Sequence, residues 1–252
     1  MTSFSFVFLL LLPFDEFPSC FSVLMKMTSF LGSKTLYICS MIQSNFNSAK
    51  IAEFLLKIKA IKLQPKDPFT WASGWKSPIY CDNRKILSHP QIRSAVKDEF
   101  VKAIKANSLL PTAIAGVATG GIAIGALVAE SLNLPFCYVR SSAKAHGLNN
   151  QIEGGLKTDE KVLVIEDLIS SGKSSLAAVK ALTENNYNVI GLGAIFSYGF
   201  KKADENFQMA NCSYFTLTNY ASLIEIAASN RYIDNNEIDT LNNWRKSPET
   251  WS

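Results

Sequence analysis

One unit repeats between residues 112 and 198: an apolar run, then a turn, then a helical segment. The apolar runs are TAIAGVA (112–118), FCYVR (136–140), VLVI (162–165) and NVIGLGAIFSY (188–198), and helical segments cover residues 122–132 and 174–183. Strands that alternate with helices in this way form a parallel sheet covered on both faces. The predicted fold class is therefore α/β, a parallel sheet flanked by helices, with its ligand beyond the carboxyl ends of the strands.

The segments on either side of this unit add further helices and one strand. Residues 41–61 place apolar side chains on one helical face, with Ser48 as the expected N-cap. A strand is expected over Ile79–Asp82, followed by a helix that begins near Pro90. The C-terminal segments ASLIEIAASN and NNEIDTLNNW have the pattern of packing helices.

The first forty residues differ in character from the rest of the chain. FSFVFLLLLPF (4–14) is apolar but too short to span a bilayer, and it lacks the basic region of a signal peptide. We therefore treat residues 1–40 as a leader or non-native extension and favour Met41 as the true start. The alternative is a leader that contacts a membrane.

Composition narrows the class of partner. The net charge is +4, and lysine and arginine do not cluster as a nucleic-acid surface requires. We expect an anionic small molecule as the partner, and neither nucleic acid nor membrane. The five cysteines are odd in number and follow no CxxC spacing, which disfavours a disulfide framework or a metal site and favours the cytoplasm.

The third apolar run leads directly into an acidic pair and a turn, in VLVIEDLISSGKSS (162–175). The GKS at 172–174 suggests a P-loop, but the glycine required five positions earlier is Asp167. Backbone amides in the turn and at the start of the following helix can bind a phosphate. Glu166 and Asp167 can accept hydrogen bonds from vicinal hydroxyls or help to hold Mg²⁺. The segment predicts a sugar phosphate site, and the alternative is an acidic pair that only caps a helix.

Residues 141–160 interrupt the alternation with a segment that has no apolar period and three glycines. A segment of this length within a compact domain is either functional or a solvated excursion. It contains Lys144 and His146, and His146 is one of only two histidines in the chain.

Four segments together resemble the orotate phosphoribosyltransferases, a family of type I phosphoribosyltransferases. VLVIEDLISSGKSS resembles the phosphoribosyl-pyrophosphate motif, and FTWASGWKSPIYCDNR (69–84) resembles the hood over the pyrimidine. GVATGGIAIGA (116–126) resembles the pyrophosphate loop, and YVRSSAKAHGLNNQIEG (138–154) the catalytic loop. The resemblance implies one phosphoribosyltransferase domain over residues 41–252, with the hood at about 41–90 and the core at about 91–252.

The resemblance also implies roles for individual residues. Glu166 and Asp167 would bind the ribose hydroxyls, residues 171–175 the 5′-phosphate, and residues 118–121 the pyrophosphate. Ser170 would lie against orotate, and Mg²⁺ would be held through the substrate near the acidic pair. The candidate catalytic residues are Lys144, His146 and Asp167. The candidate substrate-binding residues are Lys76, Tyr80, Cys81, Thr119, Gly120, Arg140, Lys144, His146, Glu166, Asp167, Leu168, Ile169, Ser170, Ser171, Gly172, Lys173, Ser174 and Ser175.

Several positions depart from the family pattern. Two lysines that often lie near the pyrophosphate are replaced here by Ala72 and Ser141. Lys173 stands where a small residue or glycine is common, and a left-handed backbone there would cost a lysine about 1 kcal/mol. An arginine that contacts orotate in some members is absent from residues 196–199, and Arg84 or Lys76 would have to compensate.

The implied reaction transfers the phosphoribosyl group of 5-phosphoribosyl 1-diphosphate to orotate, giving orotidine 5′-phosphate and diphosphate in pyrimidine (UMP) biosynthesis. In the family the catalytic loop reaches into the neighbouring subunit, so the resemblance implies a homodimer with shared active sites. Two alternatives remain open: a purine-type phosphoribosyltransferase, and a regulator that senses the sugar diphosphate without catalysis. The hood segment argues against the first, and the sequence has no helix-turn-helix or basic arm to support the second.

Overall fold

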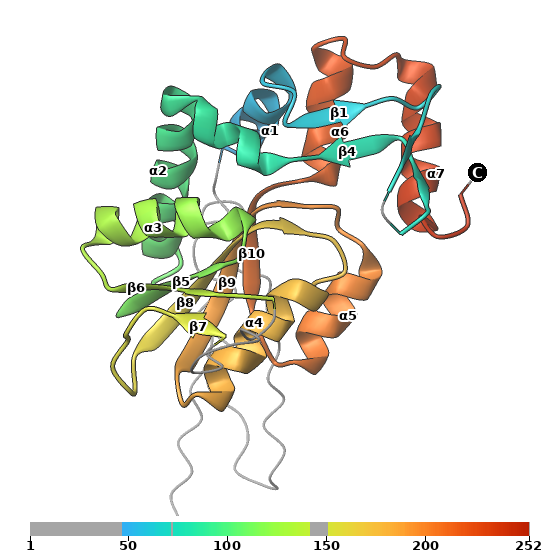
Figure 1. Ribbon diagram of the computed structural model, residues 1–252. Helices are drawn as coiled ribbons and strands as arrows, with labels where there is room; N and C mark the ends of the chain where they lie inside the picture. Colours follow the sequence, from blue (N-terminus) through green and yellow to red (C-terminus); the bar gives the residue numbers. More distant parts are fainter. Residues whose placement is uncertain (1–46, 72, 142–150, 252) are drawn as a thin grey trace, which may run out of the picture. The chain divides into compact units, whose positions relative to one another are not determined.

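The computed structural model describes residues 47–71, 73–141 and 151–251. At its centre is a six-stranded sheet in the order β10-β9-β8-β5-β6-β7 (Figure 1). Neighbouring strands are parallel except β7, which runs antiparallel to β6. The strands are β5 (Ala113–Val117), β6 (Phe136–Val139), β7 (Ile152–Glu153), β8 (Lys161–Ile169), β9 (Asn188–Ser197) and β10 (Tyr214–Asn219).

Helices cover both faces of this sheet, because each strand points alternate side chains to opposite faces and both sets are apolar. Ile114 and Leu163 face the side covered by α1, α2, α3 and α6. Ala115 and Val164 face the side covered by α4 and α5, which lie opposite α2 and α3 (Figure 1). The helices are α1 (Ser48–Lys57), α2 (Pro90–Ala106), α3 (Gly120–Leu132), α4 (Lys173–Glu184), α5 (Lys201–Met209), α6 (Tyr220–Ser229) and α7 (Ile238–Lys246). None of the helices in the described ranges is long and apolar enough to cross a membrane.

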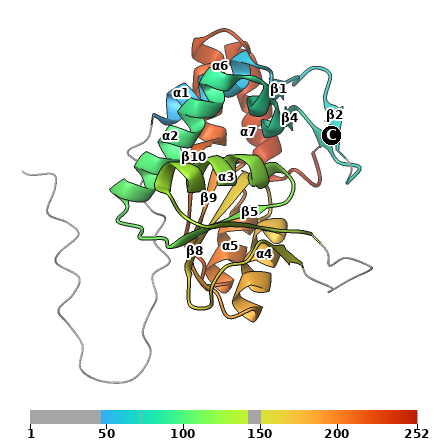
Figure 2. The same cartoon turned by 60° about the vertical axis from the view of Figure 1, so that its left-hand side comes forward.

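Short strands from the N-terminal part of the chain lie near α6 and α7 (Figure 2). Trp71 links them to the rest: its ring centroid lies 5.6 Å from that of Trp244 in α7 and 5.3 Å from that of Tyr198, which follows β9. Its indole N–H donates to the Ile79 carbonyl at 3.0 Å. These contacts hold the N-terminal strands close to the carboxyl end of β9. The remaining elements are β1 (Ile61–Leu63), β2 (Phe69–Thr70), β3 (Lys76–Ser77), β4 (Ile79–Cys81) and the 3-10 helices η1 (Asn83–Ser88) and η2 (Asn235–Glu237).

The predicted α/β class is confirmed, and so are the four apolar strands of the repeating unit. The third strand is longer than predicted: β8 continues past Ile165 to Ile169, so the acidic pair lies within the strand and not after it. Pairing with β9 accounts for this, since from Leu163 onward the two strands stay in register as far as Ile169 opposite Ser197. The sequence analysis missed β1, β2, β3, β7, β10 and α5, and it extended the first helix to Ile61, which begins β1. In β10 the polar threonines hide the apolar pattern.

The N-cap predicted for α1 is also wrong by one residue. The side chain of Asn47 accepts from the Lys50 N–H at 3.2 Å and caps the helix. Ser48 is the first helical residue, and its hydroxyl donates to Thr218 Oγ1 at 3.0 Å. Both side chains can cap a helix, so only the packing of α1 against β10 decides which one does.

Candidate active site

The acidic pair lies where β8 extends beyond its neighbour β5. Pairing between these strands ends at Ile165 opposite Gly116, whereas β8 and β9 remain paired for four more residues. The chain after β5 turns at Thr119 and starts α3 at Gly120, directly beside the part of β8 that β5 no longer pairs with. The peptide bond that precedes Thr119 is cis.

Two glycines make this close approach possible. A Cβ at Gly120 would lie 2.2–2.4 Å from the carboxyl atoms of Asp167. A Cβ at Gly121 would lie 2.3 Å from the carbonyl oxygen of Ile165. Because neither glycine has a side chain, the start of α3 can lie against the strand and the Asp167 carboxyl group. The predicted pyrophosphate loop and the acidic pair are therefore neighbours in space.

Glu166 is held by hydrogen bonds inside the protein. Its Oε1 accepts from the Asp167 N–H at 2.9 Å, and its Oε2 accepts from the Ser175 hydroxyl at 3.2 Å. Only 4% of the residue is exposed. Burial, followed by the negative charge of Asp167, raises the pKa of Glu166 from 4.5 to about 9. Burial and the neighbouring carboxylate therefore favour the neutral form of the Glu166 carboxyl group over its charged form.

The turn after β8 has the geometry of an anion site. Gly172 takes the left-handed conformation, with φ of 76°, and α4 begins at the next residue. Lys173 thus has helical backbone, so the strain considered for a lysine at this position does not arise. The first amides of α4 have no partner within the helix and carry its positive dipole end, which suits a phosphate.

One pocket of about 440 Å³ brings these parts together. It is lined by the acidic pair, the turn before α4 and the start of α3, so two helix N-termini meet at it. The lining residues are Ala118, Thr119, Gly120, Glu166, Asp167, Leu168, Ser170, Ser171, Gly172, Lys173 and Ser174. In this set Lys173 is the only cation.

Comparison with known proteins agrees with this geometry. The family model described as "Phosphoribosyl transferase domain" matches residues 82–224. "Orotate phosphoribosyltransferase" of Porphyromonas gingivalis is 56% identical over 201 residues, covering 80% of this chain and 96% of the relative. The chain belongs to the orotate phosphoribosyltransferase family.

Further members of the orotate phosphoribosyltransferase family support the assignment. The relative in Bacteroides thetaiotaomicron is 56% identical over 200 residues, covering 79% of this chain and 94% of the relative. The crystal structure of orotate phosphoribosyltransferase from Aeropyrum pernix has a TM-score of 0.63 at 26% identity, covering 73% of this chain and 99% of that one. The fold class and the family inferred from the motifs are both confirmed.

Other predicted site residues of this orotate phosphoribosyltransferase family member lie outside the pocket lining. Ile169 and Ser175 are fully buried. Arg140 forms an ion pair with Glu153 at 3.5 Å. Lys144 and His146 fall outside the described residues.

The hood residues named from the sequence lie along β3 and β4. Lys76 donates to the Thr70 hydroxyl at 3.0 Å, and Tyr80 is 42% exposed. The Cys81 thiol donates to Asn83 Oδ1 at 3.3 Å, and burial raises its pKa well above the ordinary value. Arg84 pairs with Asp82 at 2.6 Å.

Two asparagines that the sequence analysis did not single out contact the backbone of the site. Asn83 donates to the Asp167 carbonyl at 2.7 Å, and Asn206 donates to the Ser171 carbonyl at 2.8 Å. Asn83 belongs to the quoted hood segment, where a polar residue directly after a strand was the available signal. Asn206 lies on a polar helix that the sequence analysis missed.

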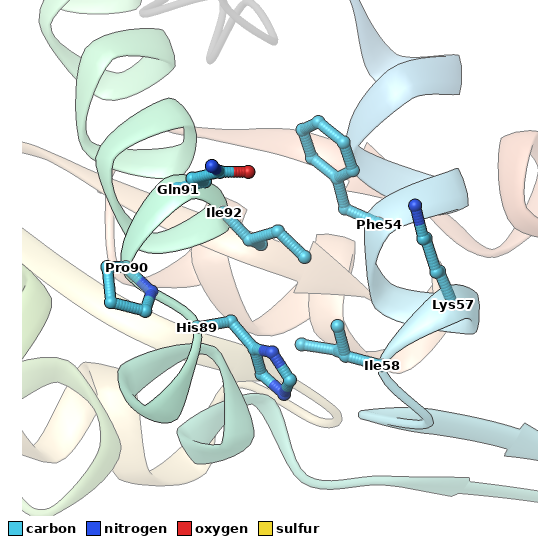
Figure 3. Close-up of a pocket in the computed structure, with 7 residues that line it drawn as sticks. All are labelled: Phe54, Lys57, Ile58, His89, Pro90, Gln91 and Ile92. Carbon is cyan, nitrogen blue, oxygen red and sulfur yellow. The ribbon is translucent and has the colours of Figure 1, made fainter.

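A larger pocket of about 580 Å³ lies between α1 and the start of α2 (Figure 3). Its lining is mainly apolar and includes Phe54, Ile58 and Ile92, with Lys57 and His89 at its edge. It has no carboxylate for sugar hydroxyls and no helix N-terminus preceded by a glycine turn. We therefore place the active site in the smaller pocket.

Proposed function

We propose that this protein transfers the phosphoribosyl group of 5-phosphoribosyl 1-diphosphate to orotate, giving orotidine 5′-phosphate and diphosphate for pyrimidine biosynthesis. The observation that carries the proposal is the 56% identity to a curated orotate phosphoribosyltransferase over 96% of that protein. The pocket supplies the two features that this substrate requires: acceptors for sugar hydroxyls and helix N-termini for its phosphate groups.

The two helix N-termini divide the substrate between them in this proposal. Amides of residues 171–174 at the start of α4 bind the 5′-phosphate, and amides around Thr119 and Gly120 at the start of α3 bind the diphosphate. Asp167 lies between these groups, where its carboxylate accepts hydrogen bonds from the ribose hydroxyls. Burial favours the neutral form of Glu166, which limits the negative charge beside this polyanionic ligand.

Catalysis follows from where charge develops. As the bond from C1′ to the diphosphate breaks, C1′ gains positive character and the diphosphate gains negative charge. The α3 amides stabilise the leaving group, because they are already oriented and need not reorganise. Lys144 and His146 are proposed to add positive charge from the catalytic loop. Orotate supplies a nitrogen nucleophile that needs no strong base, so His146 acts as a charge-stabilising donor.

The residues at the pocket fit a magnesium ion only in part. Asp167 and Thr119 offer the hard oxygen donors that Mg²⁺ prefers. The described ranges contain no cluster of three or more metal-ligating side chains, so substrate phosphates and water would provide the other ligands. When bound, the ion would neutralise charge on the diphosphate.

Assembly and location complete the proposal. We infer a homodimer in which the catalytic loop of each chain completes the site of the other, as the family resemblance implies. The same resemblance and the scattered cysteines favour a cytoplasmic enzyme.

Ultraviolet absorbance of orotate tests the reaction directly. We expect the absorbance to fall when the protein, 5-phosphoribosyl 1-diphosphate and Mg²⁺ are combined, and to fall at least ten times more slowly with Asp167→Asn at the same protein concentration and limiting 5-phosphoribosyl 1-diphosphate. Adenine, guanine and hypoxanthine in place of orotate should give no diphosphate. Turnover of a purine instead of orotate would assign the protein to the purine-type enzymes, and ligand binding without any turnover would indicate a sensor.

A further inference from the structure

Two asparagine side chains donate hydrogen bonds to the main chain of residues 167–171, one at each end of this ligand-binding segment. Asn83, at the start of η1, donates from Nδ2 to the Asp167 carbonyl at 2.7 Å. Asn206, in α5, donates from Nδ2 to the Ser171 carbonyl at 2.8 Å. Neither asparagine lines the pocket. Each can therefore affect a ligand only through the backbone that it holds.

The bond from Asn83 replaces a missing strand. Beyond Ile165, no residue of β5 pairs with β8, so backbone groups on that side of β8 lose their sheet partners. At Asp167, side chains provide the hydrogen-bond partners of both backbone groups: Glu166 accepts from the N–H and Asn83 donates to the carbonyl. Buried backbone groups need such partners. Asn83 is itself only 2% exposed, so its amide is committed to this contact.

Asn83 also connects the sugar site to the N-terminal strands. Its Oδ1 accepts from the Cys81 thiol of β4 at 3.3 Å. Asn83 and Asp167 are 84 residues apart in the chain, yet one side chain joins strand β4 to the carboxylate-bearing residue of β8. A change at Asn83 should therefore shift Asp167 without touching the phosphate turn.

The bond from Asn206 fixes the other end of the segment against α5. The next residue of that helix, Phe207, packs so closely that a Cβ at Gly172 would lie 2.7 Å from its ring. Asn206 and Phe207 thus both contact the turn from α5. We expect these contacts to fix the direction of the backbone amides at the start of α4.

We propose that Asn83 and Asn206 are positioning residues with different roles. Asn83 positions the site for the ribose hydroxyls, and Asn206 positions the site for the 5′-phosphate. The naming of these subsites rests on the proposed function. The two bonds have the same chemistry but lie at opposite ends of the segment. Their loss should therefore weaken different parts of one ligand.

Binding of two probes separates the two duties. Asn83→Asp and Asn206→Asp keep the side-chain size but replace the donor with an acceptor. We expect Asn206→Asp to lower the affinity for inorganic phosphate and the affinity for ribose 5-phosphate alike, by roughly five- to tenfold. Asn83→Asp should lower the affinity for ribose 5-phosphate by a similar factor and leave the affinity for inorganic phosphate unchanged. Equilibrium titration of the full chain measures both.

Asn185→Asp is the matched control. Asn185 Nδ2 donates to the Ala181 carbonyl at 2.8 Å near the end of α4, so this variant loses the same kind of bond away from the pocket. It should lower stability without changing either affinity. If an aspartate variant does not fold, Asn83→Ala and Asn206→Ala remove the donor without adding charge and give the same test.

The proposal is overturned if both asparagine variants weaken the two probes equally, or if neither differs from Asn185→Asp. Orotate turnover is measured separately on the unaltered protein. An enzyme that fails to convert orotate but shows the expected pattern of probe affinities would refute the proposed function and retain this inference.

Discussion

Alanine at Gly120 and alanine at Gly121 add the same methyl group to neighbouring positions, yet the two methyl groups would meet different atoms. At Gly120 the new Cβ lies 2.2–2.4 Å from the carboxyl group of Asp167, which is the end of a side chain and can rotate away. At Gly121 it lies 2.3 Å from the Ile165 carbonyl oxygen and 3.2 Å from Glu166 Cα, which are backbone atoms of the central sheet. Function should suffer at the first position and stability at the second.

The expected sizes follow from these contacts. Gly121→Ala forces α3 away from β8, and overpacking of this kind costs about 1–3 kcal/mol, or roughly 2–12 °C in Tm for a chain of this size. Gly120→Ala gains about 0.4–1 kcal/mol because alanine lowers the conformational entropy of the unfolded chain, and this gain offsets much of the strain. It displaces the Asp167 carboxylate, however. Loss of a charge-assisted hydrogen bond to a ribose hydroxyl costs about 1.5–3 kcal/mol, or roughly ten- to a hundredfold in affinity.

Thermal denaturation and isothermal titration with 5-phosphoribosyl 1-diphosphate measure the two effects. Gly155→Ala is the control, because a Cβ there meets no atom within 4 Å. We expect Gly120→Ala to melt within a few degrees of the unaltered protein, about as the control does, and to bind the sugar diphosphate at least ten times more weakly. A Gly120→Ala variant with normal affinity would refute the placement of the Asp167 carboxylate in the sugar site.

Four further predictions test the site. Asp167→Asn should weaken 5-phosphoribosyl 1-diphosphate roughly ten- to a hundredfold and orotate little, and titration with each ligand would contradict this if both losses were equal. Lys173 stands at the positive end of α4, where the helix dipole disfavours a cation. Lys173→Glu should therefore stabilise the free protein by about 0.3–1 kcal/mol in denaturant titration and lower its affinity for inorganic phosphate. A loss of stability would contradict the expected interaction with the helix dipole. The pKa of Glu166, raised to about 9, makes unfolding release a proton between about pH 4.5 and 9, so stability falls as pH rises through that window. The free energy of unfolding of Glu166→Gln, relative to that of the unaltered protein, should therefore rise between pH 5 and pH 8. An equal difference between the two proteins at both pH values would show that Glu166 does not cause the pH dependence. Mixed and reassociated Lys144→Ala and Asp167→Asn chains should recover up to about a quarter of normal activity if sites are shared, and recovery no greater than the sum of the two variants would show that the loop serves its own chain.

The acidic pair shows how far local sequence carries a prediction. Apolar runs, turn glycines and helical periodicity are properties of neighbouring residues, so VLVIEDLISSGKSS was sufficient to predict a strand, a phosphate-binding turn and a helix. It was not sufficient to separate Glu166 from Asp167. Only the structure shows that Glu166 is bonded to Ser175 and buried, while Asp167 lies beside Gly120 at the pocket.

Residues that act across the fold escaped prediction for the same reason. Asn83 acquires its partner because β5 ends before β8 and because β4 lies nearby, and both facts depend on strand lengths set elsewhere in the chain. Asn206 depends on the packing of α5 against the phosphate turn. The sequence by itself determined the α/β class and the order of the motifs, and it predicted a sugar phosphate as the ligand, because these follow from local patterns. The tertiary structure decided which carboxyl group is buried and which amides hold the loop, because the backbone groups left without partners are known only once the strands are paired.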